Sequence, residues 1–180
     1  MLSKTLIPNY SPDYKQCMKV PVLSTSKILM CKLFNYDIDE SWVDWAIEMM
    51  EAGFESENLY MLAGISRPFN QFELQDLTNK VLKDLQLDFS DKDLVIKNYT
   101  YYIILNSINH PEKYLVVLRE LKEICLNLNL DADYMNFYLL YFAKADLIES
   151  EMQWYWDDAN RDNIDDIIKS QFTEWLINFR

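Results

Sequence analysis

The sequence contains very little glycine and histidine, and this excludes several common kinds of site. Its 180 residues include two glycines, Gly53 and Gly64, and one histidine, His110. Two isolated glycines cannot form a glycine-rich phosphate-binding loop or a dinucleotide-binding fingerprint. One histidine cannot build a His-based zinc cluster. Because His110 directly precedes Pro111, we expect a helix junction there. The sequence therefore identifies no catalytic residue, no cofactor and no metal ligand.

Cysteine and long apolar runs are also scarce, which bears on the cellular compartment. The cysteines Cys17, Cys31 and Cys125 are odd in number, widely spaced and without a CxxC pair. We interpret them as buried, reduced thiols. No apolar run approaches the roughly 18 residues of a membrane-spanning helix. The stretch Met1–Pro8 is too short for the apolar part of a signal peptide. The sequence therefore predicts a cytoplasmic protein without a membrane span.

Acidic residues outnumber basic ones, and the imbalance is uneven along the chain. The net charge is −12. Residues 1–34 hold five lysines against Asp13, a net charge of +4, so residues 35–180 carry −16. Because affinity for nucleic acids rests on lysine and arginine, we expect no nucleic-acid partner. The acidic body fits a basic protein partner, although acidity that only maintains solubility is the simpler explanation.

Prolines concentrate at the N-terminus, where Pro8, Pro12 and Pro21 lie. We predict that residues 1–27 form an irregular arm, packed on the body through its apolar side chains. Residues 28–180 are predicted to form one all-helical domain. A chain of this length buries about two-thirds of its unfolded surface.

Capping signals and apolar stripes with helical spacing recur along this domain. Helix starts are indicated at Asp37–Glu40, Ser56, Asn70, Ser90, either Asp131 or Asp133, and Asp162, and Gly53 is placed to end a helix. No segment alternates with the period of two that a strand would show. The sequence therefore predicts an all-α fold, with about seven to nine helices in a single domain.

The stretch from Phe89 to Leu128 is expected to form the centre of the fold. Ser90 is placed to cap a helix that is apolar on nearly every side between Tyr99 and Leu105, which is typical of a buried helix. Pro111 then suits the first position of a second helix. The resulting hairpin is predicted to bury deeply Tyr102, Ile103, Leu105, Leu118 and Leu121.

The spacing of the helix starts leaves two arrangements open. The starts near Asn70, Ser90, His110 and Asp131 lie about 20 residues apart, so that a helix pair takes about 40 residues, as in HEAT-like repeats. After Asp131 this period fails, because the next strong start is Asp162. The helices therefore form either HEAT-like stacked helical hairpins or an irregular orthogonal bundle.

Carboxylates are the only plentiful chemical groups, and they are densest near the C-terminus. The run contains Glu149, Glu151, Asp157, Asp158, Asp162, Asp165 and Asp166. Four or more converging carboxylates can hold a divalent cation. The run has no Glu-x-x-His motif and no calcium-loop pattern. An exposed acidic rim is thus the simpler interpretation, and a carboxylate enzyme or metal-binding protein is the alternative.

Three consecutive aromatic residues, Trp154, Tyr155 and Trp156, precede Asp157 and Asp158 in this acidic run. Successive helical side chains turn by about 100°, so all three cannot share one face. We therefore expect at least one of them to be partly exposed. Trp and Tyr are enriched in binding hot spots, and the flanking acids would complement a basic partner. The hypothesis is a partner-binding surface at Trp154–Asp158 and Asp162; alternatively, the aromatics fill gaps in the core.

Several segments together resemble small, acidic, all-α bacterial proteins of uncharacterised function. The segments are Trp42–Gly53 (WVDWAIEMMEAG), Ser56–Gly64 (SENLYMLAG), Pro68–Leu74 (PFNQFEL) and the tail from Tyr141 to Leu176. Some small acidic proteins of that kind are immunity partners of secreted toxins. The resemblance implies a non-enzymatic, helical protein-interaction protein, and it offers no catalytic residue to transfer.

Overall fold

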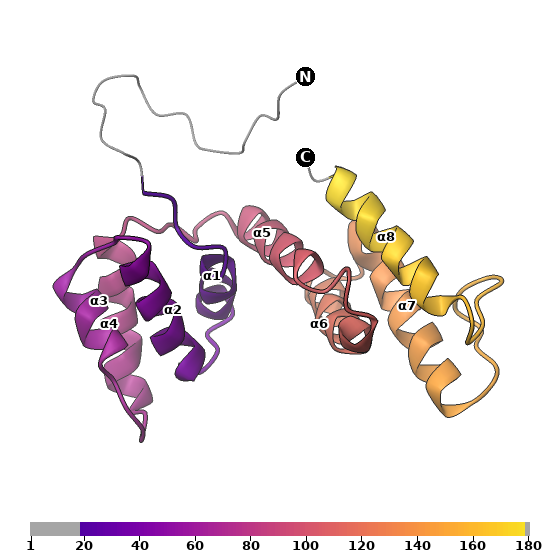
Figure 1. Cartoon of the computed structure of the whole chain (residues 1–180), viewed down its shortest axis with the longest axis horizontal. Helices are drawn as coiled ribbons and strands as arrows, with labels where there is room; N and C mark the ends of the chain where they lie inside the picture. Colours follow the sequence, from indigo (N-terminus) through magenta and orange to yellow (C-terminus); the bar gives the residue numbers. More distant parts are fainter. Residues whose placement is uncertain (1–18, 179–180) are drawn as a thin grey trace.

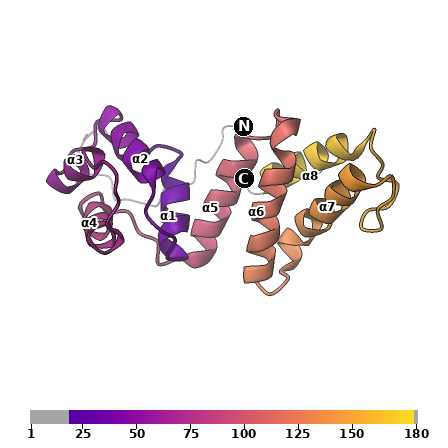
Figure 2. The same cartoon turned by 90° about the horizontal axis from the view of Figure 1, so that it is seen from below.

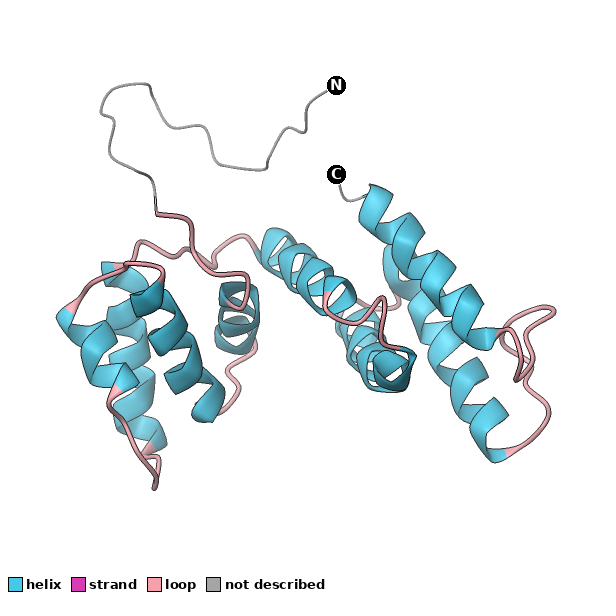
Figure 3. Ribbon diagram, in the orientation of Figure 1, coloured by secondary structure: helices cyan, strands magenta, loops and turns pink. Residues whose placement is uncertain are grey.

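The computed structural model describes residues 19–178, and this part of the chain contains eight α-helices, one 3-10 helix and no strand (Figure 3). The predicted all-α fold and the number of helices are therefore confirmed. No helix among these residues is long and apolar enough to cross a membrane. The elements are α1 (Thr25–Leu33), α2 (Glu40–Glu51), α3 (Glu57–Ala63), α4 (Gln71–Asp84), α5 (Lys92–Leu105), η1 (Pro111–Lys113), α6 (Tyr114–Asn127), α7 (Ala132–Glu149) and α8 (Ile164–Asn178).

Most of the predicted helix starts are confirmed by side chains that cap them. Ser56 accepts a hydrogen bond from the backbone N–H of Leu59 at 3.0 Å. Asp39, Asn70 and Asp131 accept from the second residue beyond them in the same way. These bonds satisfy N–H groups that the first turn of a helix leaves unpaired. Gly53 has a φ of +87° just after α2, as expected for a glycine that ends a helix.

The prediction that Ser90 caps α5 is wrong. Asp91 is the N-cap, and its Oδ1 accepts from the backbone N–H of Leu94 at 3.0 Å. The Ser90 hydroxyl instead donates to Asp88 Oδ2 at 2.8 Å. Serine and aspartate are both good caps. In this sequence the preceding Asp88 engages the serine, and the helix begins one residue later than predicted.

The helices are spread along the long axis of the molecule (Figures 1 and 2). At one end lie α2, α3 and α4, and α1 lies between them and α5. The middle is formed by α5 and α6, and the other end by α7 and α8. The most extensive helix pairs are α6 with α7, α2 with α3, and α1 with α5. The pairing of α1 with α5 joins helices that are far apart in the sequence. Hairpins stacked strictly in chain order would not bring them together, so the arrangement is irregular.

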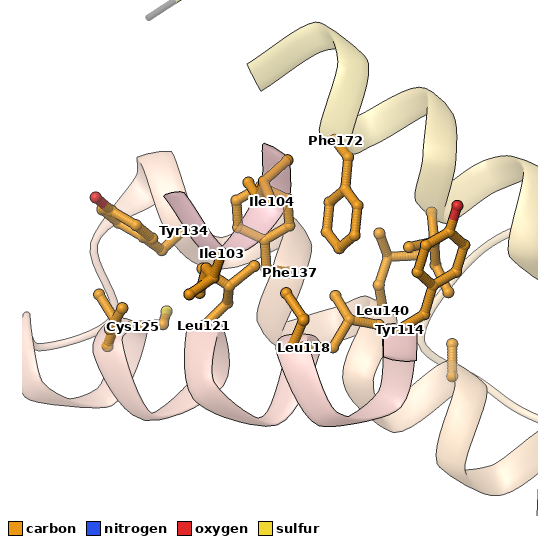
Figure 4. Packing of buried hydrophobic residues seen from close by; sticks show 14 of the residues in the cluster. Ile103, Ile104, Tyr114, Leu118, Leu121, Cys125, Tyr134, Phe137, Leu140 and Phe172 are labelled. Atoms are coloured by element: carbon orange, nitrogen blue, oxygen red, sulfur yellow. The ribbon is translucent and has the colours of Figure 1, made fainter. Parts of the chain in front are cut away.

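Two groups of buried side chains stabilise this arrangement. The first includes Trp42, Trp45 and Met49 of α2, with residues of α3 and α4. The second lies among α5, α6, α7 and α8 (Figure 4). There the ring of Phe172 packs edge-on against Tyr114, with centroids 5.4 Å apart. The helix α1 contributes to both groups: its residues Ile28 and Met30 lie in the first and second core, respectively.

The predicted central hairpin is only partly correct. Ile103, Leu118 and Leu121 are buried as expected, but Leu105 is 39% exposed and Tyr102 is half-buried. The reason is that α6 packs far more extensively on α7 than on α5. Consequently α5 keeps an open side at its C-terminal end, where Leu105 lies.

The predicted N-terminal arm is described from Lys19 onward, and this part contacts the helical domain. Lys19 donates from Nζ to the carbonyl of Gly53, and Val22 packs against the first core. The chain then enters α1 at Thr25. The rest of the proposed arm, including Cys17, lies outside the described residues.

Candidate functional site

The Trp-Tyr-Trp run lies in the loop of residues 150–163, which joins α7 to α8 (Figure 1). We call this segment the α7–α8 loop. The prediction that Asp162 starts the last helix is wrong, because α8 begins at Ile164. Two asparagines hold a turn just before it: Asn160 Oδ1 accepts from the Asp162 N–H at 2.9 Å, and Asn163 Oδ1 accepts from the Asn160 N–H at 2.8 Å. Such side-chain bonds to backbone amides favour turns over helix.

The side chain of Gln153 organises the centre of the α7–α8 loop. Its Oε1 accepts from the backbone N–H groups of Tyr155 and Trp156 at 2.8 and 2.9 Å. Its Nε2 donates to the carbonyls of Trp156 and Ala159 at 2.6 and 3.1 Å. One carboxamide therefore makes four bonds within seven consecutive residues, 153–159. The backbone around the aromatic run has a defined conformation although it is not helical.

Arg161 ties the same loop to the end of α7. Its Nε donates to the carbonyl of Leu147 at 2.7 Å, and its Nη2 donates to the carbonyl of Ser150 at 3.1 Å. The last carbonyls of a helix have no partner within the helix, so these bonds also complete the C-terminus of α7. The single cation of the loop is thereby directed toward the helix end.

The three aromatic side chains of the run have different surroundings. Trp154 is 86% exposed, and Tyr155 is 41% exposed with its ring stacked on that of Phe142 at a centroid distance of 5.2 Å. Trp156 is half-buried and packs against the second core. The prediction that at least one of the three is exposed is confirmed. Trp156 anchors the loop, and Trp154 presents its indole to solvent.

The carboxylates predicted to accompany these aromatics lie on the same loop. Asp157, Asp158 and Asp162 are exposed, and Asp158 has a φ of +60°. Residues 146–166 contain eight acidic residues and one basic residue, Arg161, which gives 1 − 8 = −7. More than half of the chain's net charge of −12 thus falls in this short segment. Nearby, Asp165 pairs with Lys144 of α7.

In the described part of the chain, the remaining candidate groups for chemistry, namely the metal-ligating residue types, His110 and the cysteines, do not form a site. Among residues 19–178, no three or more His, Cys, Asp or Glu side chains are arranged to hold a metal ion. His110 is exposed at the helix junction predicted for it, and its Nδ1 lies 3.1 Å from Glu112. Cys125 is a buried free thiol as predicted, and Cys31 is a half-buried one. Burial raises the pKa of both thiols, which keeps them protonated and poorly nucleophilic.

Three residues that shape this surface were not found from the sequence. Gln153 and Arg161 fix the loop by side-chain bonds to backbone groups, and such bonds leave no pattern in residue spacing. Phe142 lies on α7, far from Tyr155 in the sequence pattern, and only the fold shows that Tyr155 stacks on it.

Comparisons of the chain with protein-family models, with curated proteins and with solved structures found no significant match. The resemblance to small acidic bacterial proteins therefore stays a hypothesis.

Proposed function

We propose that this chain is a non-enzymatic interaction protein, and that it binds a basic protein through the α7–α8 loop. The observation that carries the proposal is the exposure of Trp154, at 86%, on a loop whose backbone is fixed by Gln153 and Arg161. A large indole held in water has an unfavourable environment, since burying such a ring is worth several kcal/mol, roughly 25 cal/mol per Å² of apolar area. A partner that covers Trp154 would recover this free energy.

The fixed conformation of the α7–α8 loop supports a binding role as much as its aromatic and acidic composition does. Ordering a flexible loop on association consumes part of the interaction free energy. Here the bonds of Gln153 and the anchoring of Trp156 hold the loop in place before any partner arrives. Aromatic side chains also lose little conformational entropy on binding, because they have only two rotatable bonds.

The charge of residues 146–166 supports a basic partner. The segment has a net charge of −7, of which Lys144 offsets one charge through its pair with Asp165, and it attracts cations over roughly one Debye length, about 8–10 Å at moderate ionic strength. Complementary charges mainly raise the association rate, and they make it fall as salt increases. Asp157 and Asp158 are exposed beside the aromatic run, so they are placed to steer such a partner.

The test is affinity capture from cells of the source organism, followed by measurement of the affinity of the purified partner. Trp154→Ala should weaken binding at least tenfold, which corresponds to about 1.4 kcal/mol, the scale of a hot-spot residue. The double variant Asp157→Lys plus Asp158→Lys should slow association and reduce its dependence on salt. Trp154 suits this test better than Trp156, whose half-buried ring supports the fold.

The matched control is Phe72→Ala. Phe72 lies on α4, near the opposite end of the row of helices, and is 88% exposed. Its removal should leave the affinity unchanged. A partner that binds the Trp154 and charge-reversal variants as tightly as the wild type would show that the α7–α8 loop is not the binding surface.

The proposal extends to immunity against a secreted toxin, the role implied by the resemblance of Trp42–Gly53 and the neighbouring segments. An acidic surface with an exposed aromatic suits a basic toxin. A neighbouring gene that encodes a secreted basic protein is expected. Cells that produce this toxin should survive with the wild-type chain and should lose protection with Trp154→Ala.

A further inference from the structure

The outer face of α7 carries a row of apolar side chains that none of the neighbouring helices covers completely. The buried residues Phe137, Leu140, Ala143 and Leu147 recur at helical spacing on one side of α7. On the opposite side, at the same spacing, lie partly exposed residues. We call this set the α7 outer stripe, and it consists of Met135, Tyr138, Phe142 and Ala145.

Rings connect the α7 outer stripe to the α7–α8 loop. The ring of Phe142 lies 5.1 Å from that of Tyr138 and 5.2 Å from that of Tyr155, measured between centroids. Tyr155 directly follows the exposed Trp154 in the chain. The apolar surface therefore runs from the tip of the loop along the helix. Ten residue steps from Met135 to Ala145 correspond to about 15 Å along a helix axis.

The contacts of α7 with α8 come from other sides of the helix. Asn136 donates from Nδ2 to Gln171 Oε1 at 2.8 Å, and Lys144 pairs with Asp165. Neither residue belongs to the α7 outer stripe. In the same way Tyr141 lies beside α6, where the Nζ of Lys122 is 4.9 Å from its ring centroid. Within the α7 outer stripe, Tyr138 packs against the second core, whereas Met135, Phe142 and Ala145 belong to neither core and form the part that remains for a further element.

The geometry points to an amphipathic helix of a basic partner as the occupant. A straight apolar row at helical spacing matches the apolar face of another helix, which presents its own residues three and four apart. A peptide that binds by adding a strand needs the edge of a sheet, and residues 19–178 contain no strand. Asp146 and Glu149 follow Ala145 on α7, and Asp157 lies two residues after Tyr155, whose ring stacks on Phe142 of the stripe. These carboxylates would meet Lys or Arg side chains that flank the apolar face of the incoming helix.

We propose that the α7 outer stripe, continued by Tyr155 and Trp154, is a docking surface for a basic amphipathic helix of another protein. This inference rests on the proposed function and adds the structural class of the bound segment. The partner supplies one more helix to the end of the row, packed on α7 as α6 is packed on its other side.

The test uses synthetic peptides and the full chain. The first peptide has about 20 residues, enough to form a helix, with leucines at helical spacing and lysines beside them. The second has the same composition in an order that destroys the apolar face. The first should bind at least tenfold more tightly than the second, and its affinity should fall with salt. Equal affinity of the two peptides would show that only charge attracts them, and would overturn the inference.

Variants of the chain locate the site. Ala145→Lys places a cation in the stripe without removing any ring, and Phe142→Ala removes the central ring. Both should weaken binding of the first peptide at least tenfold, while Phe72→Ala should not change it. Because Phe142→Ala also alters packing, Ala145→Lys decides the outcome, with circular dichroism confirming its helix content. Unchanged binding by Ala145→Lys would overturn the inference.

The captured natural partner separates this inference from the proposed function. If Trp154→Ala weakens the natural complex and Ala145→Lys does not, the loop binds the partner but no helix lies on the α7 outer stripe. If neither variant weakens it, the proposed function fails together with the inference.

Discussion

Lys32 of α1 donates from Nζ to Gln75 Oε1 of α4 at 2.7 Å, and the same ammonium group lies 3.1 Å from the hydroxyl of Thr78. The side chain is buried, and its partners are uncharged oxygens. Burial lowers the pKa of Lys32. The bonds connect the first helix to the fourth across the first core, so this buried cation contributes to the position of α1.

Replacing Lys32 should therefore destabilise the protein. Lys32→Ala leaves the partly buried Gln75 and the buried Thr78 hydroxyl without this partner and removes the packed stem, which should cost about 1–3 kcal/mol. The exposed Lys83 on α4 provides the control, and Lys83→Ala should change stability by less than about 0.5 kcal/mol. Urea unfolding at neutral pH measures both. Equal midpoints for the two variants would mean that the bonds of Lys32 contribute nothing.

Ionisation of Tyr99 should lower the free energy of unfolding at alkaline pH. Its hydroxyl donates to Glu120, and burial together with the Glu120 carboxylate raises its pKa well above the ordinary value of 10.0. The unfolded state then ionises first as the pH rises past 10, and the stability contributed by Tyr99 is lost progressively above that pH. Tyr99→Phe should be less stable than the wild type by about 1.5–3 kcal/mol at pH 7, the range for a bond to a charged group.

The comparison above pH 10 tests the sign of this effect. The Phe variant lacks the ionisable group, whereas Tyr36, Tyr102, Tyr114 and Tyr134 remain in both proteins. Urea midpoints between pH 7 and pH 11 should therefore converge as the pH rises. A difference that stays constant over this range would show that the Tyr99 phenol does not titrate differently in the folded and unfolded states.

Asp91 and Ser90 give a matched test of the start of α5. Asp91→Ala should destabilise by about 1 kcal/mol, because the N–H of Leu94 loses its cap. Ser90→Ala removes only an exposed bond to Asp88 and should cost less than about 0.5 kcal/mol. The midpoints of thermal unfolding show which of the two variants is less stable. If Ser90→Ala were the more damaging change, the helix would begin one residue earlier.

Leu118 and Leu105 give a corresponding test of the core. Leu118 is fully buried on α6, and Leu118→Ala should cost about 2–5 kcal/mol. Leu105→Ala should cost about 1 kcal/mol or less, since 39% of the side chain is already exposed. Denaturant unfolding should separate the two midpoints clearly. Similar losses would contradict the open side of α5.

Gln153 should control the order of the α7–α8 loop. Gln153→Met keeps the length of the side chain but removes its four hydrogen bonds. The backbone amides of Tyr155 and Trp156 should then exchange with solvent faster, while core amides stay protected. Met152→Ala is the control, because the Met152 side chain is exposed. Unchanged exchange at Tyr155 would show that other contacts fix the loop.

The helices could be predicted from the sequence because their signals are local. Ser56 and Asn70 bond to amides two or three residues away, and Gly53 adopts its positive φ just after α2. The packing of these helices depends on contacts between distant segments. Residue spacing does not reveal that α1 pairs with α5. Nor does it reveal that α6 packs mainly on α7, which leaves Leu105 of α5 partly exposed.

The candidate surface could be predicted as a composition but not as a shape. The run Trp154–Asp158 is visible in the sequence, and so is the rule that its rings cannot share one helical face. Which ring is exposed depends on the turn that Gln153 imposes and on the second core, into which Trp156 packs. Both are properties of the folded chain.

The position of α1 has a consequence for cooperativity. Ile28 belongs to one core and Met30 to the other, on opposite sides of a helix of nine residues. If either core unfolded, α1 would lose the packing contacts on one of its two sides. Apolar side chains of the remaining core that α1 had covered would then become exposed to water. The free-energy cost of exposing this apolar surface couples the first core to the second. Both cores should therefore unfold in a single transition, although few direct contacts join them.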